Sequence, residues 1–244
     1  MRRKLQLAAT FLTIITTATY AQTIHSPQIK QKEKKQKPSV NEWLWQYSPP
    51  PADGRENDLI RDPHFLPFLK ENLTTPQTFW GVPGHTYKSL AETVYDFLSV
   101  PGKVIADDNR YITVTGCVFH FCPARGLLWV DLNAPETFVV FAAIDWIRDS
   151  KTPQQPEAEY TLWIFSNRSL GLTPEAPGRI PEALTRSLGR WAAEPVPGTK
   201  FSQNITHAIV VDPDGTPHQV SLASVGLTSK STDSDSSTET KEKP

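Results

Sequence analysis

The chain has 244 residues, with 25 Lys or Arg against 26 Asp or Glu and a formal net charge of −1. This balance excludes the basic surface that is typical of proteins that bind nucleic acid or an anionic membrane. The chain also has 22 prolines against 12 glycines, which indicates stiff and irregular connections between its elements.

The N-terminus has the pattern of a secretory signal. Residues 1–4 are Met-Arg-Arg-Lys, residues 5–17 are apolar with interspersed threonines, and Thr19 and Ala21 are small residues at the usual cleavage positions. The apolar stretch is too short and too rich in threonine to be a strong membrane span. We therefore expect a signal peptide over residues 1–21, no membrane span, and a periplasmic or secreted mature protein.

Polar segments flank the expected domain at both ends. Residues 22–40 are polar and basic, and residues 228–244 are mostly Ser, Thr, Asp, Glu and Lys with no large apolar side chain. Segments of this composition bury too little apolar surface to fold by themselves. We expect a flexible linker over 22–40, a single domain over 41–227 and a disordered tail over 228–244. Attraction of the basic linker to an anionic envelope surface is an alternative function for it.

The first part of the domain predicts helices. Residues 57–73 carry apolar side chains at helical spacing, but Pro63 and Pro67 interrupt them, so a short or broken helix is expected. Ser89-Leu90-Ala91-Glu92 then fits a capping box, with an apolar helical stripe behind it. Pro101-Gly102 should end this second helix.

The following segments predict a β-sheet. Residues 103–106 and 110–116 should form a hairpin around Asp107-Asp108-Asn109. Further strands are expected over 125–132, 137–144, 159–166, 205–211 and 219–222. The run 137–144 is continuously apolar, as in a central strand that is covered on both faces. Pro181 should open a helix that reaches about Ala192. The succession predicts an α+β fold, an antiparallel sheet with flanking helices.

The only two cysteines flank a histidine, in the sequence Cys117-Val-Phe-His120-Phe-Cys122. In an oxidising compartment we expect them to form a disulfide. A ring this small restrains the unfolded chain by only about 2 kcal/mol, so it suits the shaping of a loop better than global stabilisation. Because the loop lies between two predicted strands, it should be a disulfide-closed hairpin tip with His120 as a candidate binding residue.

This loop resembles the hallmark of the inhibitor of vertebrate lysozyme (Ivy) family. The resemblance covers roughly residues 75–166 and rests on the Cys-x-x-His-x-Cys loop, residues 104–111, Arg125, Trp129 and residues 141–145. Members of the family are secreted bacterial proteins with an antiparallel sheet backed by helices, and some are dimers. The resemblance implies that His120, held by Cys117 and Cys122, enters the active-site cleft of a c-type lysozyme and hydrogen-bonds the catalytic carboxylates.

The loop departs from the common family sequence, Cys-Lys-Pro-His-Asp-Cys. Val118 stands in place of the Lys, Phe119 in place of the Pro and Phe121 in place of the Asp. The chain therefore lacks the acidic loop residue that would attract a basic lysozyme, and two phenylalanines offer apolar contacts instead. We expect these three residues to set which cleft accepts the loop. Residues 171–227 have no clear counterpart in the family.

Other interpretations stay open. His120 could be a partly buried turn residue with no partner, or it could join Cys117 and Cys122 in a metal site, although zinc sites usually need two further ligands and oxidised cysteines cannot ligate. A catalytic thiol is a third possibility. The favoured function is that of an inhibitor, not an enzyme, with no cofactor, no nucleic acid and a lysozyme-type glycoside hydrolase as its partner. The alternative is a non-inhibitory periplasmic envelope protein or binding module on the same scaffold.

Overall fold

A computed structural model of the chain describes residues 41–48, 55–81, 84–134, 136–172 and 180–228. These residues fall in one compact unit, Pro38–Pro244. The expected signal peptide over 1–21, the linker over 22–40 and the tail from residue 229 onward lie outside the described residues. None of the described helices is long and apolar enough to cross a lipid bilayer.

The domain is built on one seven-stranded sheet, whose strands lie side by side in the order in which they occur in the chain. The strands are β1 (Val100–Asp107), β2 (Tyr111–Val118), β3 (Phe121–Asp131), β4 (Phe138–Trp146), β5 (Glu159–Ser166), β6 (Asn204–Val211) and β7 (Pro217–Val220). Every neighbouring pair is antiparallel except β5 and β6, which are parallel. The predicted α+β class is confirmed.

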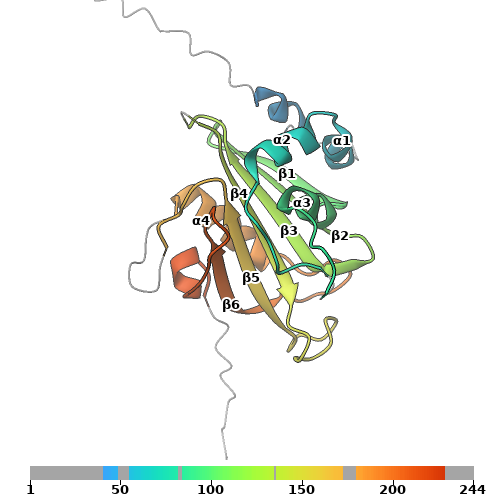
Figure 1. Cartoon of the computed structure of the whole chain (residues 1–244). Helices are drawn as coiled ribbons and strands as arrows, with labels where there is room; N and C mark the ends of the chain where they lie inside the picture. Colours follow the sequence, from blue (N-terminus) through green and yellow to red (C-terminus); the bar gives the residue numbers. More distant parts are fainter. Residues whose placement is uncertain (1–40, 49–54, 82–83, 135, 173–179, 229–244) are drawn as a thin grey trace, which may run out of the picture. The chain divides into compact units, whose positions relative to one another are not determined.

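Helices cover both faces of this sheet. The helical elements are η1 (Glu42–Tyr47), α1 (Arg55–Arg61), α2 (Phe65–Asn72), α3 (Leu90–Phe97), α4 (Glu182–Ala193) and η2 (Leu222–Val225). Figure 1 shows α1, α2 and α3 over one face and α4 over the other. One apolar cluster joins the first three helices to the sheet, and a second joins α4 and η2 to the opposite face.

The central strand β4 shows why this region is continuously apolar. Val139, Phe141 and Ala143 lie in the cluster under α1–α3, whereas the alternating residues from Val140 to Ile144 lie in the cluster under α4. Side chains of a strand alternate between the two faces, so a strand covered on both sides has no polar positions to spare. The predicted central strand over 137–144 is confirmed.

All three predicted helical regions are present, the last of them as α4. The interrupted region 57–73 is the pair α1 and α2, with Pro63 between them. Pro67 lies in the first turn of α2, where a backbone N–H has no acceptor within the helix and its loss costs little. At α3 the Ser89 side chain accepts from the Glu92 N–H and the Glu92 side chain accepts from the Ser89 N–H, which confirms the capping box.

The prediction that Pro101-Gly102 ends the second helix is wrong. The helix α3 ends at Phe97, and both residues belong to the edge strand β1, whose register shifts between Pro101 and Val104. An edge strand tolerates a proline because one side of it needs no ladder hydrogen bonds. Gly102 suits the bulge, since a Cβ there would lie 2.5 Å from the Thr115 Oγ1 atom.

Two further expectations need correction. The sheet is not wholly antiparallel, because the connection that contains α4 brings the chain back to the same end of the sheet, and β6 then runs parallel to β5. Apolar periodicity shows which residues form a strand but not its direction. Residues 219–222 were expected to be a strand, but β7 ends at Val220 and Leu222 begins η2.

Candidate functional site

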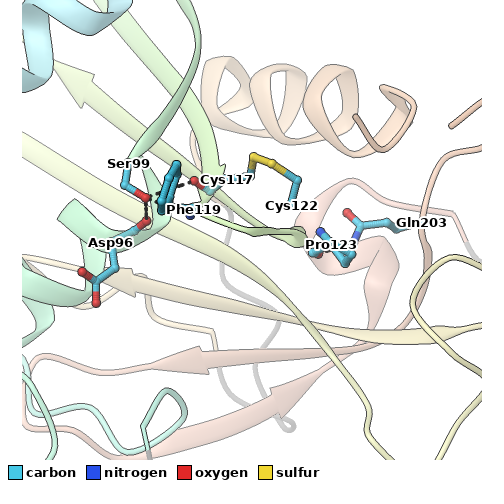
Figure 2. The surroundings of a disulfide bond; sticks show 7 residues. All are labelled: Asp96, Ser99, Cys117, Phe119, Cys122, Pro123 and Gln203. Carbon is cyan, nitrogen blue, oxygen red and sulfur yellow. Dashed lines mark hydrogen bonds between the residues drawn. A yellow bond between two sulfur atoms is a disulfide. The ribbon is translucent and has the colours of Figure 1, made fainter. Parts of the chain in front are cut away.

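The candidate site is the turn between β2 and β3. Val118 pairs with Phe121 across the hairpin, which leaves Phe119 and His120 as a two-residue turn. His120 has φ = +62°, in the left-handed region that residues other than glycine adopt infrequently. Cys117 and Cys122 are disulfide-bonded, so the predicted disulfide-closed hairpin tip is confirmed (Figure 2).

A bulge in β3 accompanies the disulfide. Cys117 pairs with Arg125 and the next residue pairs with Phe121, so Cys122, Pro123 and Ala124 have no pairing partner on β2. Extra residues of this kind bend a strand and redirect the side chains beyond them. The disulfide joins the regular strand β2 to this bulge, and the two-residue turn lies beyond the bridge.

Ser99 holds the turn from the side of α3. Its hydroxyl accepts a hydrogen bond of 3.0 Å from the Phe119 N–H and donates one of 2.6 Å to the carbonyl of Asp96. Figure 2 shows the Ser99 side chain between these two residues. The turn is thereby connected to the C-terminal end of α3, which itself packs on β2 and β3.

Gln203 and Arg125 hold the bulge from the other side. The Gln203 Nε2 atom donates to the Pro123 carbonyl at 2.6 Å, and the Gln203 Oε1 atom accepts from Arg125 at 3.4 Å. The Arg125 guanidinium also donates to the carbonyls of Trp191 and Glu194 at 2.8 and 3.0 Å, at the end of α4. These contacts connect the base of the tip to the segment between α4 and β6.

Arg125 is a buried charge. Only 4% of the residue is exposed, and its guanidinium lies 5.3 Å from the centre of the Trp191 ring. Burial lowers the pKa of Arg125 to about 10, and the Glu194 carboxylate, 3.6 Å away, acts in the opposite direction. Removing a partner from a buried charged network is costly, so this residue should be important for the stability of the tip region.

Asp145 lies near the end of β4, one position beyond the last residue that pairs with β3 and next to the bulge. It accepts a hydrogen bond of 2.8 Å from the Trp146 N–H. Burial raises the pKa of Asp145 to about 6, while that hydrogen bond and the charge of Arg148 act to lower it. The tip end of the sheet therefore contains a carboxyl group whose charged form is disfavoured by the fold.

The four residues predicted to face a target have two different environments. Phe119 is 63% exposed and His120 is exposed, with their ring centres 3.8 Å apart. Val118 and Phe121 are partly buried and pack against the cluster under α1–α3. The turn thus presents an imidazole and a phenyl ring. His120 is a turn residue, but the expectation that it could be partly buried is wrong.

The disulfide argues against the two other roles that the sequence allowed for the cysteines, as metal ligands or as a catalytic thiol. Both thiols are bonded to each other, so Cys117 and Cys122 offer no thiolate to a metal ion and no nucleophile. Within the part of the chain that the structure describes, no group of three or more His, Cys, Asp or Glu side chains is arranged to hold a metal ion.

The residues that hold the tip, Ser99 and Gln203, could not be found from the sequence. Ser99 lies 20 residues before Phe119, and Gln203 lies 80 residues after Pro123. Neither residue belongs to a local motif, and only the packing of α3 and of the α4–β6 connection against the sheet brings them together. Arg125 was singled out as part of the family resemblance, but its contacts to the end of α4 had no signal in the sequence.

Comparisons of the chain with protein-family models, with curated proteins and with solved structures find no match in any of the three. The likeness to the Ivy family therefore rests only on the Cys-x-x-His-x-Cys loop, residues 104–111, Arg125, Trp129 and residues 141–145.

Proposed function

We propose that this protein is an inhibitor that inserts the β2–β3 tip into the active-site cleft of a lysozyme-type glycoside hydrolase. The observation that carries the proposal is the exposed His120 ring on a disulfide-closed turn that Ser99 and Gln203 hold from two sides. The resemblance of the loop to that of the Ivy family supports the choice of target.

The imidazole suits the chemistry of such a cleft. A lysozyme-type site contains two carboxyl groups, of which one is a protonated general acid and the other is ionised. A neutral imidazole has one donor and one acceptor nitrogen, so it can donate to the ionised group and accept from the acid. His120 would therefore satisfy both carboxyl groups while the turn blocks the substrate.

The contacts that hold the tip in the free protein reduce the entropy cost of this mode of binding. A loop that is ordered before binding loses less conformational entropy when it enters a cleft than a mobile loop does. The disulfide, the Ser99 hydroxyl and the Gln203 amide each restrict the tip in the free protein. The protein acts in the periplasm or outside the cell, where the N-terminal pattern directs the chain and where a disulfide persists.

A second candidate is a non-inhibitory envelope protein or binding module on the same scaffold. It is favoured by the loop sequence, because residues 117–124 carry no formally charged side chain and so offer no acidic group to a basic enzyme. In that case the tip binds a different partner through the same two exposed rings.

The two candidates differ in a binding and inhibition assay. The mature chain is mixed with purified c-type, g-type and i-type lysozymes, and both lysis of cell walls and direct binding are measured. The inhibitor proposal expects one class to be bound and inhibited, with binding lost when a chitin oligosaccharide fills the cleft. Failure to bind any of the three classes favours the second candidate, and binding that persists with the oligosaccharide present contradicts insertion into the cleft.

A further inference from the structure

We infer that Phe119 is the residue that determines specificity at the tip, and that it fits an apolar pocket beside the general acid of the target enzyme. The inference rests on the proposed inhibitory function and adds the chemistry of the partner surface to it. In this arrangement Phe119 contacts the apolar wall and His120 reaches the carboxyl groups.

The first argument is the distribution of burial around the turn. Phe119 is 63% exposed, whereas the next most exposed large apolar side chains among the described residues are Tyr95 at 37% and Tyr87 at 36%. Val118 and Phe121 already pack against the domain's own core. Phe119 is therefore the apolar loop side chain with most of its surface still to bury in a partner, and burial of such surface drives association.

The second argument is that the Phe119 backbone is held by Ser99 and that its ring contacts the His120 ring. Its N–H is held by the Ser99 hydroxyl, and its ring lies against the His120 ring at a centre-to-centre distance of 3.8 Å and an angle of 49°. Aromatic side chains that are held in place before binding are the typical anchors of protein interfaces, because few rotamers are lost on association. The two rings therefore form one unit that enters the partner together.

The third argument is the absence of charge at the tip. Residues 117–124 contain no Lys, Arg, Asp or Glu. The partner surface that fits this unit is apolar with a hydrogen-bonding group at its edge, and electrostatic attraction between the tip and the cleft is not needed. Since salt screens only the interactions of charges, the affinity of the tip should depend little on ionic strength.

A lysozyme-type cleft has a region with these properties. Its general acid stays protonated because it lies in an apolar pocket, while its second carboxyl group lies in a polar environment and stays ionised. An apolar ring beside an imidazole complements this contrast. The adjacent Phe119 and His120 would therefore meet the two parts of the cleft at the same time.

The test uses the mature chain and whichever of the c-type, g-type and i-type lysozymes it binds. The parent protein, Phe119→Ala, Phe119→Leu and the control Tyr87→Ala, which truncates an exposed ring before α3, are compared by isothermal titration at about 0.05 and about 0.5 M salt. We expect Phe119→Ala to weaken binding by about 10–100-fold and Phe119→Leu by less than about 5-fold, because leucine retains much of the apolar surface. Tyr87→Ala should bind as the parent does, and salt should change the parent's affinity by less than about 3-fold.

The outcomes separate the two claims. If the parent binds a lysozyme and Phe119→Ala binds equally well, the role of Phe119 is wrong while the inhibitory function stands. Strong salt dependence of the parent would contradict the apolar partner surface in the same way. If the parent binds no lysozyme, the proposed function fails and this inference fails with it.

Discussion

The two turns at the ends of β2 differ in what holds them. At the β1–β2 turn, Asp107 pairs with Tyr111, and Asp108 and Asn109 between them both have positive φ, a conformation that Asp and Asn adopt more readily than most residues. The Asp107 and Asp108 carboxylates pair with Arg190 and Arg186 of α4. The β2–β3 turn instead contains Phe119 and His120, whose side chains are exposed.

The comparison shows a turn that forms through its own sequence and a turn that depends on its surroundings. Asp and Asn adopt the left-handed region readily, whereas the β2–β3 turn has His120 in that region and Phe119, which is not a typical turn residue, beside it. The β2–β3 turn is supported by the disulfide, by Ser99 and by the contacts of Gln203 and Arg125. A local disulfide together with distant support from Ser99, Gln203 and the end of α4, for a turn that exposes two rings, is expected where the rings themselves are needed for binding.

The largest expected effect on stability comes from replacing Arg125, the buried side chain that connects β3 to the end of α4. Arg125→Ala should lower the free energy of unfolding by about 3–5 kcal/mol, because it leaves the Trp191 and Glu194 carbonyls without their donor in a buried position. Urea unfolding monitored by tryptophan fluorescence measures this change.

The matched control at the other end is Arg190→Ala. The Arg190 side chain pairs with Asp107 but is 42% exposed, so its loss should cost less than about 1 kcal/mol. Equal losses of unfolding free energy in Arg125→Ala and Arg190→Ala would show that the β2–β3 end of the sheet depends on its arginine contacts no more than the β1–β2 turn does.

Replacement by Asn should change the free energy of unfolding at neutral pH in opposite directions at Asp145 and at Asp131. The pKa of Asp145 is raised above its ordinary value, so its contribution to stability is complete below about pH 4 and is lost as the pH rises to about 6. Asp145→Asn should therefore match the parent at low pH and exceed its stability by about 1–3 kcal/mol above pH 6.

The control is Asp131→Asn, at the end of the sheet near the polar turn. Asp131 accepts two hydrogen bonds from Arg110, at 2.8 and 2.6 Å, so its replacement should destabilise the protein at neutral pH. The free energies of unfolding of the parent and both variants are measured by urea denaturation at pH 4 and pH 7. An Asp145→Asn variant that is less stable than the parent at pH 7 would contradict the claim that burial disfavours the charged form of Asp145.

Loss of the disulfide should have a smaller effect on folding than on binding. The double variant Cys117→Ser, Cys122→Ser removes a ring that restrains the unfolded chain by only about 2 kcal/mol, so the domain should stay folded at room temperature. Circular dichroism of the double variant tests whether the domain stays folded. Thiol labelling of the parent, denatured but not reduced, tests the disulfide itself and should find no free thiol. Unfolding of the double variant would mean that the bridge stabilises the whole domain.

Ser99→Ala should give the smallest change in stability, about 0.5–1.5 kcal/mol, because only the hydrogen bonds of one partly exposed hydroxyl, to the Phe119 N–H and to the Asp96 carbonyl, are lost. Amide hydrogen exchange should become faster at Phe119. The Arg110 N–H, which donates to the Asp107 carbonyl in the other turn, is an internal control and should exchange as before. Unchanged protection of the Phe119 amide would show that the hydroxyl does not hold the tip.

The sequence was sufficient for features that depend on local chemistry. The capping box at Ser89, the turn at Asp108-Asn109 and the doubly covered strand β4 all follow from side chains close together in the chain. The disulfide followed from two cysteines and an expected compartment. What the sequence did not predict depends on long-range packing, namely the parallel pairing of β5 with β6 and the contacts of Ser99 and Gln203 with the tip.

In the proposed inhibitor, the β2–β3 tip binds its target through His120. The most direct measurement is the affinity of the mature chain for whichever lysozyme class it binds, compared with that of His120→Asn, because asparagine tolerates the left-handed backbone at this position. We expect the variant to remain folded and to bind about 30–1000-fold more weakly, as for the loss of a buried contact to a charged group. Unchanged affinity of His120→Asn, with the parent bound to the same enzyme, would contradict the claim.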